Sequence, residues 1–250
     1  MAEAAQNRTV LEITGTEREH FLQGLVSNDV SGLAGRLAYA ALLTPQGKYL
    51  ADFFLTARDD TILLDVESAL ADGLLRRLSM YKLRADVAIA PSTLHVQRGL
   101  GDAPDGALAD PRHPDLGWRI YSPEAGTAPE IDWDAIRVAH CIPETGIELI
   151  PDETYILEAG FEALHGVDFK KGCYVGQEVT ARMKHKTELR KGLTTVRING
   201  EAPVGTELTT DGKTAGTLFT QSGGRAIAYL RFDRAKGALQ AGDATLQWDG

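Results

Sequence analysis

The residues whose types are best suited to chemistry lie in the segment 171–178, which reads Lys-Gly-Cys-Tyr-Val-Gly-Gln-Glu. Cys173 is one of two cysteines in the chain; it follows two lysines and stands between Gly172 and Gly176. Glycines let a backbone approach another group closely, and neighbouring cations favour the thiolate form of a cysteine. A helix beginning near Gly176 would favour the thiolate further, since a helix N-terminus carries partial positive charge. The pattern predicts a functional thiol rather than an inert buried one.

The residues after Cys173 open that predicted helix. Gln177 and Glu178 fall in its first turn, and Glu178 and Arg182 are four residues apart. Residues at this spacing share one face of a helix and can form an ion pair. Such a pair either stabilises the first turn or forms a polar wall beside the thiol, and the sequence leaves both readings open.

Other thiol and imidazole groups could join Cys173. Cys141 follows His140, and the remaining candidates near Cys173 are His165 and His185. No pair among them has the CxxC or HxxxH spacing typical of zinc sites, so a stable metal site is not expected. A cysteine nucleophile with His165 or His185 as its base remains a second hypothesis, because sequence spacing does not test it.

Composition limits the class of protein. The 250 residues are 43% hydrophobic and 24% charged, which is ordinary for a globular protein. The formal net charge of −9 disfavours a broad nucleic-acid surface. No apolar run reaches the roughly 20 residues that span a bilayer, the start lacks an apolar signal region, and two cysteines do not make a disulfide framework. We therefore expect a cytoplasmic protein with no membrane or direct nucleic-acid partner, or a mitochondrial matrix protein if the source is eukaryotic, although no transit peptide is visible.

The first half of the chain is predicted to alternate strands with two helices. A helix from Thr16 to Gly24 follows a capping box, and leucines at 70, 74 and 78 have helical spacing. A Thr-Pro-Gln-Gly turn at 44–47 predicts a hairpin. The expected strands or extended segments are 9–13, 37–43, 49–56, 61–66 and 86–90.

The second half predicts loops, one helix and a small barrel. Residues 101–129 are rich in Pro, Gly, Asp and Ala, with a strand expected at 117–121, and a helix at 132–141 is ended by Pro143. Short alternating strands then predict a barrel or sandwich, expected at 193–198, 207–210, 214–219 and 226–232. We expect an α+β body over residues 1–186, with two subdomains if the stretch near 92–130 is a linker, and a barrel over 187–250.

Charged residues elsewhere offer further candidates. Asp65 ends a predicted strand before a helix, where a carboxylate either faces a cleft or serves a turn. Lys82 and Arg84 follow the next helix, where they either meet an anionic ligand or line a solvated edge. The residue types alone decide neither case.

The segment 171–178 resembles the signature of the YgfZ family, whose members are folate-binding relatives of the glycine-cleavage T-protein and include a mitochondrial iron–sulfur assembly factor. Further matches run in the family's order along nearly the whole chain. They are Phe21–Gly24 with Asn28 and Asp29, Leu43–Lys48, Tyr81–Arg84, Asp110–Arg112 with Gly117–Arg119, Ile142–Glu144, Val179–Arg182, and Arg190 with Lys191.

The resemblance implies a fold and a role. The fold would be an α+β body with ferredoxin-like portions around a central folate cavity, followed by a C-terminal β-barrel. The role would be assembly, maturation or repair of iron–sulfur clusters, particularly of the 4Fe–4S type, with indirect support of tRNA modification through enzymes that carry such clusters. In that family the cysteine that matches Cys173 is functionally required.

The resemblance also implies a ligand and partners. The ligand would be tetrahydrofolate or a derivative, with Asp65 facing the donors of the pterin and Lys82 or Arg84 facing the acidic tail. Glu158 joins them, because the Leu-Glu-Ala-Gly stretch at 157–160 is similar to one in the T-protein. Cys173 would lie at the cavity mouth and act as a transient cluster ligand beside cysteines of an assembly protein or a client enzyme.

The chain departs from the T-protein pattern at two places and from the YgfZ family pattern at one. The arginine expected before Asp152 and Glu153 is absent, and Gly117–Tyr121 stands where the T-protein has Gly-Tyr-Thr-Gly-Glu. Cys141 stands where the family more often has glycine. The first two departures put aminomethyl transfer in doubt, so a tetrahydrofolate-dependent aminomethyltransferase and a non-enzymatic interaction module stand as alternatives.

Overall fold

The computed structural model describes residues 2–186 and 188–250, and these form two compact units. Unit 1 takes in the chain up to Ile131 and the segment Glu162–Glu178, whereas unit 2 takes in Asp132–Phe161 and the chain from Val179 onward. The segment 132–161, expected in the body, therefore groups with the barrel. One reason is a hydrogen bond of 2.7 Å from the Thr195 hydroxyl to the carbonyl of Val138.

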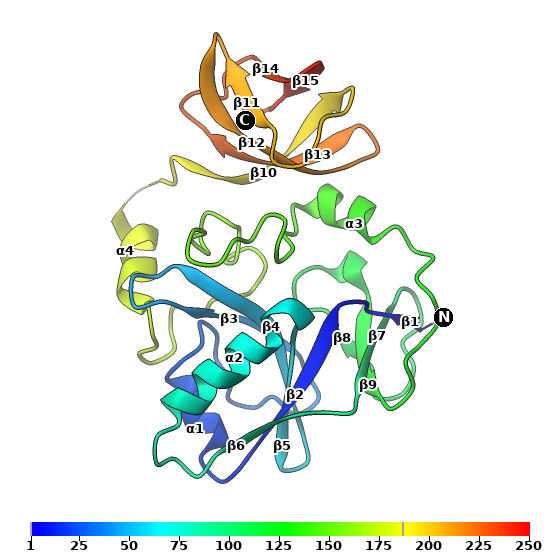
Figure 1. Ribbon diagram of the computed structural model, residues 1–250, viewed down its shortest axis with the longest axis vertical. Helices are drawn as coiled ribbons and strands as arrows, with labels where there is room; N and C mark the ends of the chain where they lie inside the picture. The colour runs from blue at the N-terminus through cyan, green and yellow to red at the C-terminus, as the bar shows by residue number, and fades with distance from the viewer. Residues whose placement is uncertain (1, 187) are drawn as a thin grey trace. The chain divides into compact units, whose positions relative to one another are not determined.

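The centre of unit 1 is a five-stranded antiparallel sheet in the order β3-β4-β5-β2-β6 (Figure 1). The predicted turn between β3 and β4 is present, with the amide of Gly47 donating to the carbonyl of Thr44 at 2.8 Å. The strands are β2 Arg8–Thr14, β3 Ala38–Leu43, β4 Tyr49–Arg58, β5 Thr61–Glu67 and β6 Ala88–Pro91.

Two helices pack on the core of this sheet (Figure 1). Helix α2 (Ser68–Tyr81) buries Ala71, Leu74 and Leu78, which confirms the predicted four-residue spacing. Helix α1 (Arg18–Gln23) begins two residues later than the capping box predicts.

The late start of α1 has a local cause. The amide and hydroxyl of Thr16 both donate to the Asp86 carboxylate, at 3.0 and 2.7 Å. Glu17 then occupies the N-cap position without a side-chain capping bond. Asp86, 70 residues away in sequence, therefore binds the Thr16 hydroxyl that the capping box would have used to cap α1.

A second antiparallel sheet of unit 1 has the order β1-β7-β9-β8. Its contact with the central sheet buries Val10, Leu63 and Val96. Strand β7 was not predicted, because its five residues, His-Val-Gln-Arg-Gly, include only one apolar side chain, that of Val96. The elements are β1 Glu3–Ala4, β7 His95–Gly99, β8 Leu108–Ala109, the 3-10 helix η1 Pro114–Leu116 and β9 Trp118–Ser122.

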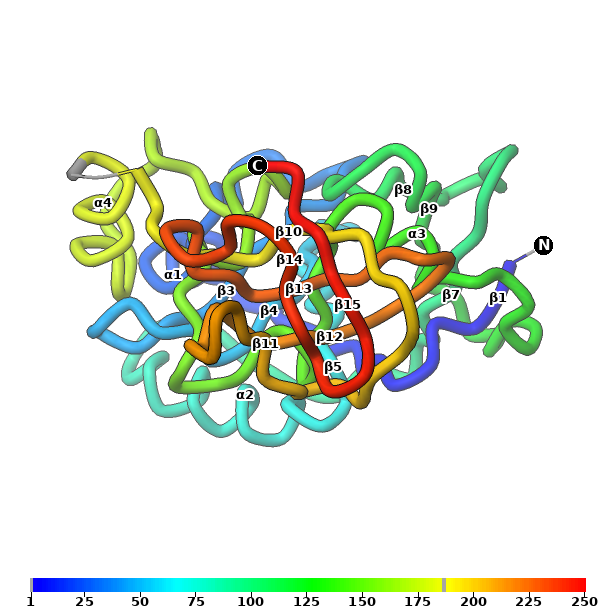
Figure 2. Tube along the Cα trace, turned by 90° about the horizontal axis from the view of Figure 1, so that it is seen from above, coloured from blue at the N-terminus to red at the C-terminus, as the bar shows by residue number. Residues whose placement is uncertain are grey.

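Unit 2 contains helix α3 (Trp133–His140) and a closed six-stranded barrel, seen from above in Figure 2. The barrel order is β10-β13-β12-β11-β14-β15, around buried side chains that include Val196, Leu208 and Leu230. The last two strands, four residues each, were not predicted. The strands are β10 Lys191–Asn199, β11 Glu207–Thr210, β12 Lys213–Ser222, β13 Arg225–Arg231, β14 Ala238–Ala241 and β15 Ala244–Gln247.

Helix α4 (Gln177–Lys186) begins at the end of unit 1 and continues into unit 2. Its start confirms the helix predicted to follow Gly176. Among the described residues, no helix has both the length and the apolar character needed to cross a membrane.

Candidate functional site

Lys171 anchors the loop that carries Cys173. Its ammonium donates to the backbone carbonyls of Val26 and Asn28, both at 2.7 Å, and lies 5.3 Å from the centre of the Tyr174 ring. Burial lowers the pKa of the Lys171 ammonium to about 8, against the opposite influence of Asp29 and Asp168. The sequence indicated only a cation beside a thiol, whereas in the structure Lys171 links the Cys173 loop to the loop that contains Val26 and Asn28.

Further hydrogen bonds join the same two loops. The Ser27 hydroxyl donates to the carbonyl of Gly166 at 2.6 Å, and the Asn28 amide donates to the carbonyl of His165 at 2.7 Å. In return, the amide of Asp168 donates to the carbonyl of Ser27 at 3.0 Å. These bonds give a positioning role to Ser27 and Asn28, which sequence reasoning had left without a role.

The two glycines beside Cys173 have different roles. At Gly176 the backbone has φ +83°, and a Cβ atom there would lie 2.6 Å from the carbonyl oxygen of Thr44 and 2.9 Å from Cβ of Leu43. At Gly172 a Cβ atom would have no neighbour within 4 Å. Only Gly176 is required for close approach, and the partner that it approaches is the β3–β4 hairpin.

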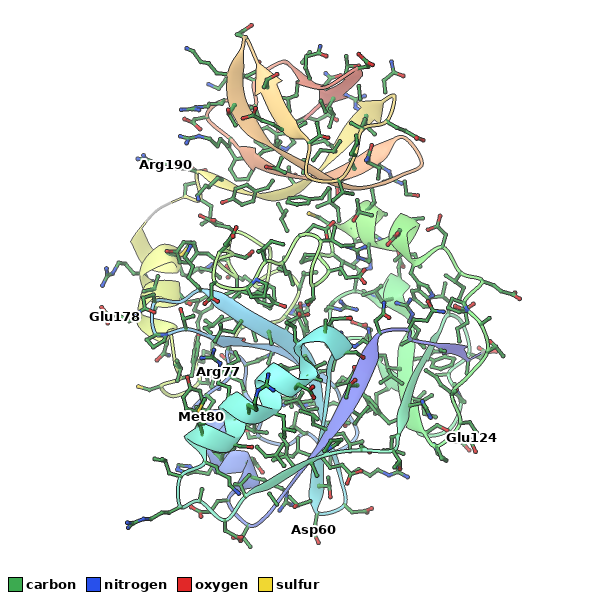
Figure 3. All side chains as sticks on the ribbon, viewed as in Figure 1. Asp60, Arg77, Met80, Glu124, Glu178 and Arg190 are labelled. Atoms are coloured by element: carbon green, nitrogen blue, oxygen red, sulfur yellow. The ribbon has the colours of Figure 1, made fainter. Side chains whose placement is uncertain are left out.

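Cys173 is exposed between these two attachments. The side-chain amide of Gln177 donates to the carbonyl of Gly172 at 3.4 Å, which ties the first residue of α4 back to the loop. Glu178 and Arg182 are both exposed on α4, and Figure 3 labels Glu178. The loop therefore presents one exposed thiol from a backbone that is fixed on both sides.

The other cysteine has a different environment. Cys141 follows α3 in unit 2, where its backbone has φ +52°. Burial raises the pKa of its thiol to about 12, and the Glu148 carboxylate adds to the rise. Cys141 is therefore a poor source of thiolate at neutral pH. The hypothesis of a nucleophile with His165 or His185 as base stays a prediction.

Asp65 is fully buried in unit 1. Its Oδ1 accepts from Nε of Arg8 at 2.6 Å, and its Oδ2 accepts from Nη1 of Arg119 at 3.1 Å and from the hydroxyl of Tyr121 at 3.3 Å. Internal partners engage both oxygens of this buried carboxylate, so it does not face a cleft here. Its expected contact with a pterin stays a prediction.

The same ion network extends to Asp110. This carboxylate accepts from Arg112 at 2.8 Å and from Arg119 at 3.1 Å, while the Arg119 guanidinium lies 4.0 Å from the centre of the Phe54 ring. Burial alone would raise the pKa of Asp110, but the two arginines outweigh it and hold the pKa at about 2. The network joins the two sheets of unit 1 through paired charges.

Asp52 is a buried carboxylate that sequence reasoning missed. Its two oxygens accept from the hydroxyls of Tyr39 and Tyr49, at 2.9 and 2.8 Å. Burial, with the Asp52 charge adding to it, raises the pKa of Tyr39 well above its ordinary value. The available signal was a charged residue within an otherwise apolar run of β4.

Lys82 and Arg84 lie beyond the far end of α2 from Asp65. The 14 residues of that helix span about 20 Å at 1.5 Å per residue. The Lys82 ammonium donates to the carbonyl of Val87 at 2.9 Å, and Arg84 is exposed. The structure does not bring these three predicted ligand contacts together.

Glu158 borders a cavity of about 280 Å³ within unit 2. Its Oε2 accepts from the hydroxyl of Tyr229 at 2.6 Å and lies 3.6 Å from Nζ of Lys191. Burial and the Glu158 carboxylate together raise the pKa of Tyr229. The lining is Glu148, Ile150, Glu153, Thr154, Glu158, Ala159, Lys191, Leu193, Thr217, Phe219 and Tyr229.

A second cavity of unit 2, about 340 Å³, shares Glu158 and Lys191 with the first. Arg190 and Arg231 also line it, so three cations border one space; Arg190 is labelled in Figure 3. The remaining lining residues are Met183, Glu188 and Leu189. Unit 2 thus combines a partly aromatic cavity bordered by three glutamates with an adjoining cavity bordered by three cations and two glutamates.

Comparison with known proteins accounts for the fold. Residues 190–249 match the model of the CAF17 C-terminal beta-barrel domain. The glycine cleavage system aminomethyltransferase T from Bartonella henselae superimposes with a TM-score of 0.77 at 14% sequence identity, over 98% of this chain and 83% of that one. The predicted α+β fold of T-protein type with a C-terminal barrel is confirmed.

Sequence comparison identifies the family. The mitochondrial iron–sulfur cluster assembly factor IBA57 of Mus musculus is 31% identical, over 93% of this chain and 78% of its own length. The chain belongs to the IBA57 family. The human IBA57 protein is 30% identical over the same shares. The YgfZ resemblance pointed to this wider group, but the matching relatives carry the IBA57 name.

One expectation is overturned by the same comparison. The sequence predicted a cytoplasmic protein, whereas the mouse and human IBA57 relatives are both named as mitochondrial. Net charge and the absence of an apolar signal region do not distinguish the two compartments, which is why composition led to the wrong one.

Proposed function

We propose that this chain assists the assembly, maturation or repair of iron–sulfur clusters, particularly in enzymes with 4Fe–4S clusters, and that Cys173 is the ligand it contributes. The observation that carries the proposal is the exposed Cys173 thiol on a loop fixed by Lys171 and Gly176. Thiolates are the preferred ligands of iron–sulfur clusters. The names of the IBA57 relatives support the same role.

The number of thiols defines what Cys173 can do. A cluster is ordinarily held by four cysteines, and Cys141 is half-buried with a thiol pKa raised to about 12. Cys173 would therefore supply one ligand beside cysteines of a partner, either an assembly protein or a client enzyme. A loop that is already ordered loses little conformational entropy when its thiol is bound, which favours transient sharing.

A folate fits the first cavity of unit 2. The Glu158 Oε1 atom has no hydrogen-bond partner within the described part of unit 2, while Oε2 is held by Tyr229. A pterin presents adjacent N–H donors on a flat ring, so a fixed carboxylate oxygen and the walls formed by Phe219 and Tyr229 match its chemistry. We assign the pterin to this cavity in place of Asp65.

The acidic tail of the same ligand fits the second cavity. Arg190, Lys191 and Arg231 border it, and it adjoins the pterin cavity through Glu158 and Lys191. Guanidinium groups pair well with carboxylates. These residues replace Lys82 and Arg84 as the proposed tail contacts.

The client enzymes define the downstream effect. Enzymes that modify tRNA and depend on iron–sulfur clusters would lose activity without this factor, so the chain would support tRNA modification indirectly. Aminomethyl transfer is not proposed, because the arginine that precedes the corresponding acidic pair of the T-protein is absent before Asp152.

Folate binding is tested by anaerobic calorimetric titration of tetrahydrofolate into wild type, Glu158→Gln and the exposed control Glu201→Gln. Loss of a charge-assisted hydrogen bond, about 1.5–3 kcal/mol, should weaken binding by about 10–150-fold in Glu158→Gln only. Absent binding to wild type, or equal affinity of all three proteins, would contradict the folate assignment.

The assembly role is tested separately in cells. Deletion of the gene should lower the activity of enzymes with 4Fe–4S clusters and leave enzymes without clusters unchanged, and the wild-type gene should restore the loss. Full activity of the cluster enzymes in the deletion strain would overturn this part of the proposal, whatever the folate titration gives.

A further inference from the structure

Two large apolar side chains protrude where α2 ends. Met80 is 66% exposed and Leu83 is 85% exposed. Leu83 also has φ +47°, a left-handed conformation that side chains other than glycine adopt at a cost. The helix ends there in a turn, with the amide of Ala85 donating to the carbonyl of Lys82 at 2.8 Å. Neither the exposure nor the backbone cost is offset by packing of Leu83 within the described chain.

Arginines surround these two side chains. Arg76 and Arg77 lie four and three residues before Met80 on α2, so helical spacing places them beside it, and Arg84 directly follows Leu83 in the turn. Figure 3 labels Arg77 and Met80 on α2. None of the three arginines forms an ion pair with a described residue.

The acidic groups nearby do not neutralise this surface. Asp72 lies one turn before Arg76; beyond the helix the Asp86 carboxylate accepts from Thr16, and the Glu17 carboxylate accepts from the Asp86 amide. The Lys82 ammonium donates to the carbonyl of Val87. The end of α2 therefore gathers four cations against three carboxylates, on a chain whose net charge is −9.

We propose that the α2 surface, defined by Arg76, Arg77, Met80, Leu83 and Arg84, docks an acidic segment of a partner protein. Leu83 and Met80 would enter an apolar pocket of the partner, and the arginines would pair with carboxylates around it. Met and Arg are enriched at protein interfaces, and the planar guanidinium forms paired hydrogen bonds with a carboxylate. Exposed methionine beside arginines is typical of a protein interface, which favours an acidic protein segment over a lipid surface. This surface goes beyond the function proposed above and does not require Cys173 to bind iron.

In-cell photo-crosslinking tests the docking surface. The full chain carries the photoreactive residue benzoylphenylalanine at position 80, and the adducts are mapped by mass spectrometry. We expect a protein adduct whose crosslinked peptide is rich in Asp and Glu. Its yield should fall at least fivefold in the Arg77→Glu, Arg84→Glu double variant. A double variant with the same net charge, Arg225→Glu with Lys236→Glu in exposed parts of the barrel, should leave the yield unchanged.

Leu83→Gly supplies the second readout. Glycine accepts φ +47° without strain, so the variant should unfold at the same or a higher temperature while the crosslinking yield falls. The proposal is overturned by the absence of an adduct, by a lipid adduct, by a crosslinked peptide without acidic residues, or by a yield that survives charge reversal. A lower melting temperature of Leu83→Gly would show a structural role for the side chain and would also overturn it.

Discussion

Gly176→Ala tests whether the Cys173 loop is held by close backbone approach. An L-residue at φ +83° costs about 1–2 kcal/mol in a left-handed conformation. The added Cβ would also lie 2.6 Å from the Thr44 carbonyl oxygen, a backbone atom that cannot swing aside. Overpacking of this kind costs about 1–3 kcal/mol. We expect the free energy of unfolding to fall by about 2–5 kcal/mol.

Gly172→Ala is the matched control, because it makes the same substitution in the same loop where no atom lies within 4 Å. Urea unfolding of the three proteins gives the free energies, and the rate of Cys173 alkylation reports the position of the loop. Gly172→Ala should stay within about 0.5 kcal/mol of wild type, as surface substitutions generally do. Gly176→Ala should be destabilised and should show an altered alkylation rate.

The opposite pattern would refute this reasoning. If Gly176→Ala matched Gly172→Ala in both stability and alkylation rate, the hairpin at 44–47 would not fix the loop. The claim that the thiol is presented in a defined position would then lose its main physical support.

Two further substitutions address buried charges. Burial places the folded-state pKa of Lys171 at about 8, below its ordinary value of 10.5, so the unfolded chain binds the proton more tightly. Wild type should therefore gain stability as pH rises from about 8 to 10.5, and urea unfolding of Lys171→Met should show no such gain. Hydrogen exchange at residues 168–176 should be faster in Lys171→Met at pH 7. Unchanged exchange would argue that the Lys171 hydrogen bonds do not hold the loop. For Asp110, the folded-state pKa of about 2 lies below the ordinary value of 3.8, so about 2 kcal/mol of stability is present above pH 3.8 and is lost as pH falls toward 2. Asp110→Asn should cost about 3–5 kcal/mol at pH 7, and its acid unfolding curve should lack that loss; a curve parallel to wild type would count against the ion network.

Local patterns predicted the elements that local interactions determine. The β3–β4 hairpin was predicted because its turn residues are adjacent in sequence, and α2 was predicted because its buried leucines have helical spacing. The start of α1 was misplaced because Asp86, a distant residue, binds Thr16. Strand β7 was missed because its residues include only one apolar side chain, and its pairing with β9 is not visible in a local pattern.

At the candidate site, too, local patterns identified residues but not their distant partners. The signature segment identified Cys173, but not the hydrogen bonds from Lys171 to carbonyls more than 140 residues earlier in the chain. It also did not show that Gly176 and Gly172 differ. Asp65 was placed in a cleft because no local signal reveals Arg8 and Arg119 as its partners.

The most direct test of the central claim compares the two cysteines in cells. Wild type, Cys173→Ala and Cys141→Ala are expressed at equal levels in a strain that lacks the chain, and the activity of a 4Fe–4S enzyme is measured. We predict that Cys141→Ala restores activity, because that thiol is half-buried and its raised pKa keeps it protonated, whereas Cys173→Ala does not. Restoration of full activity by Cys173→Ala would contradict the account.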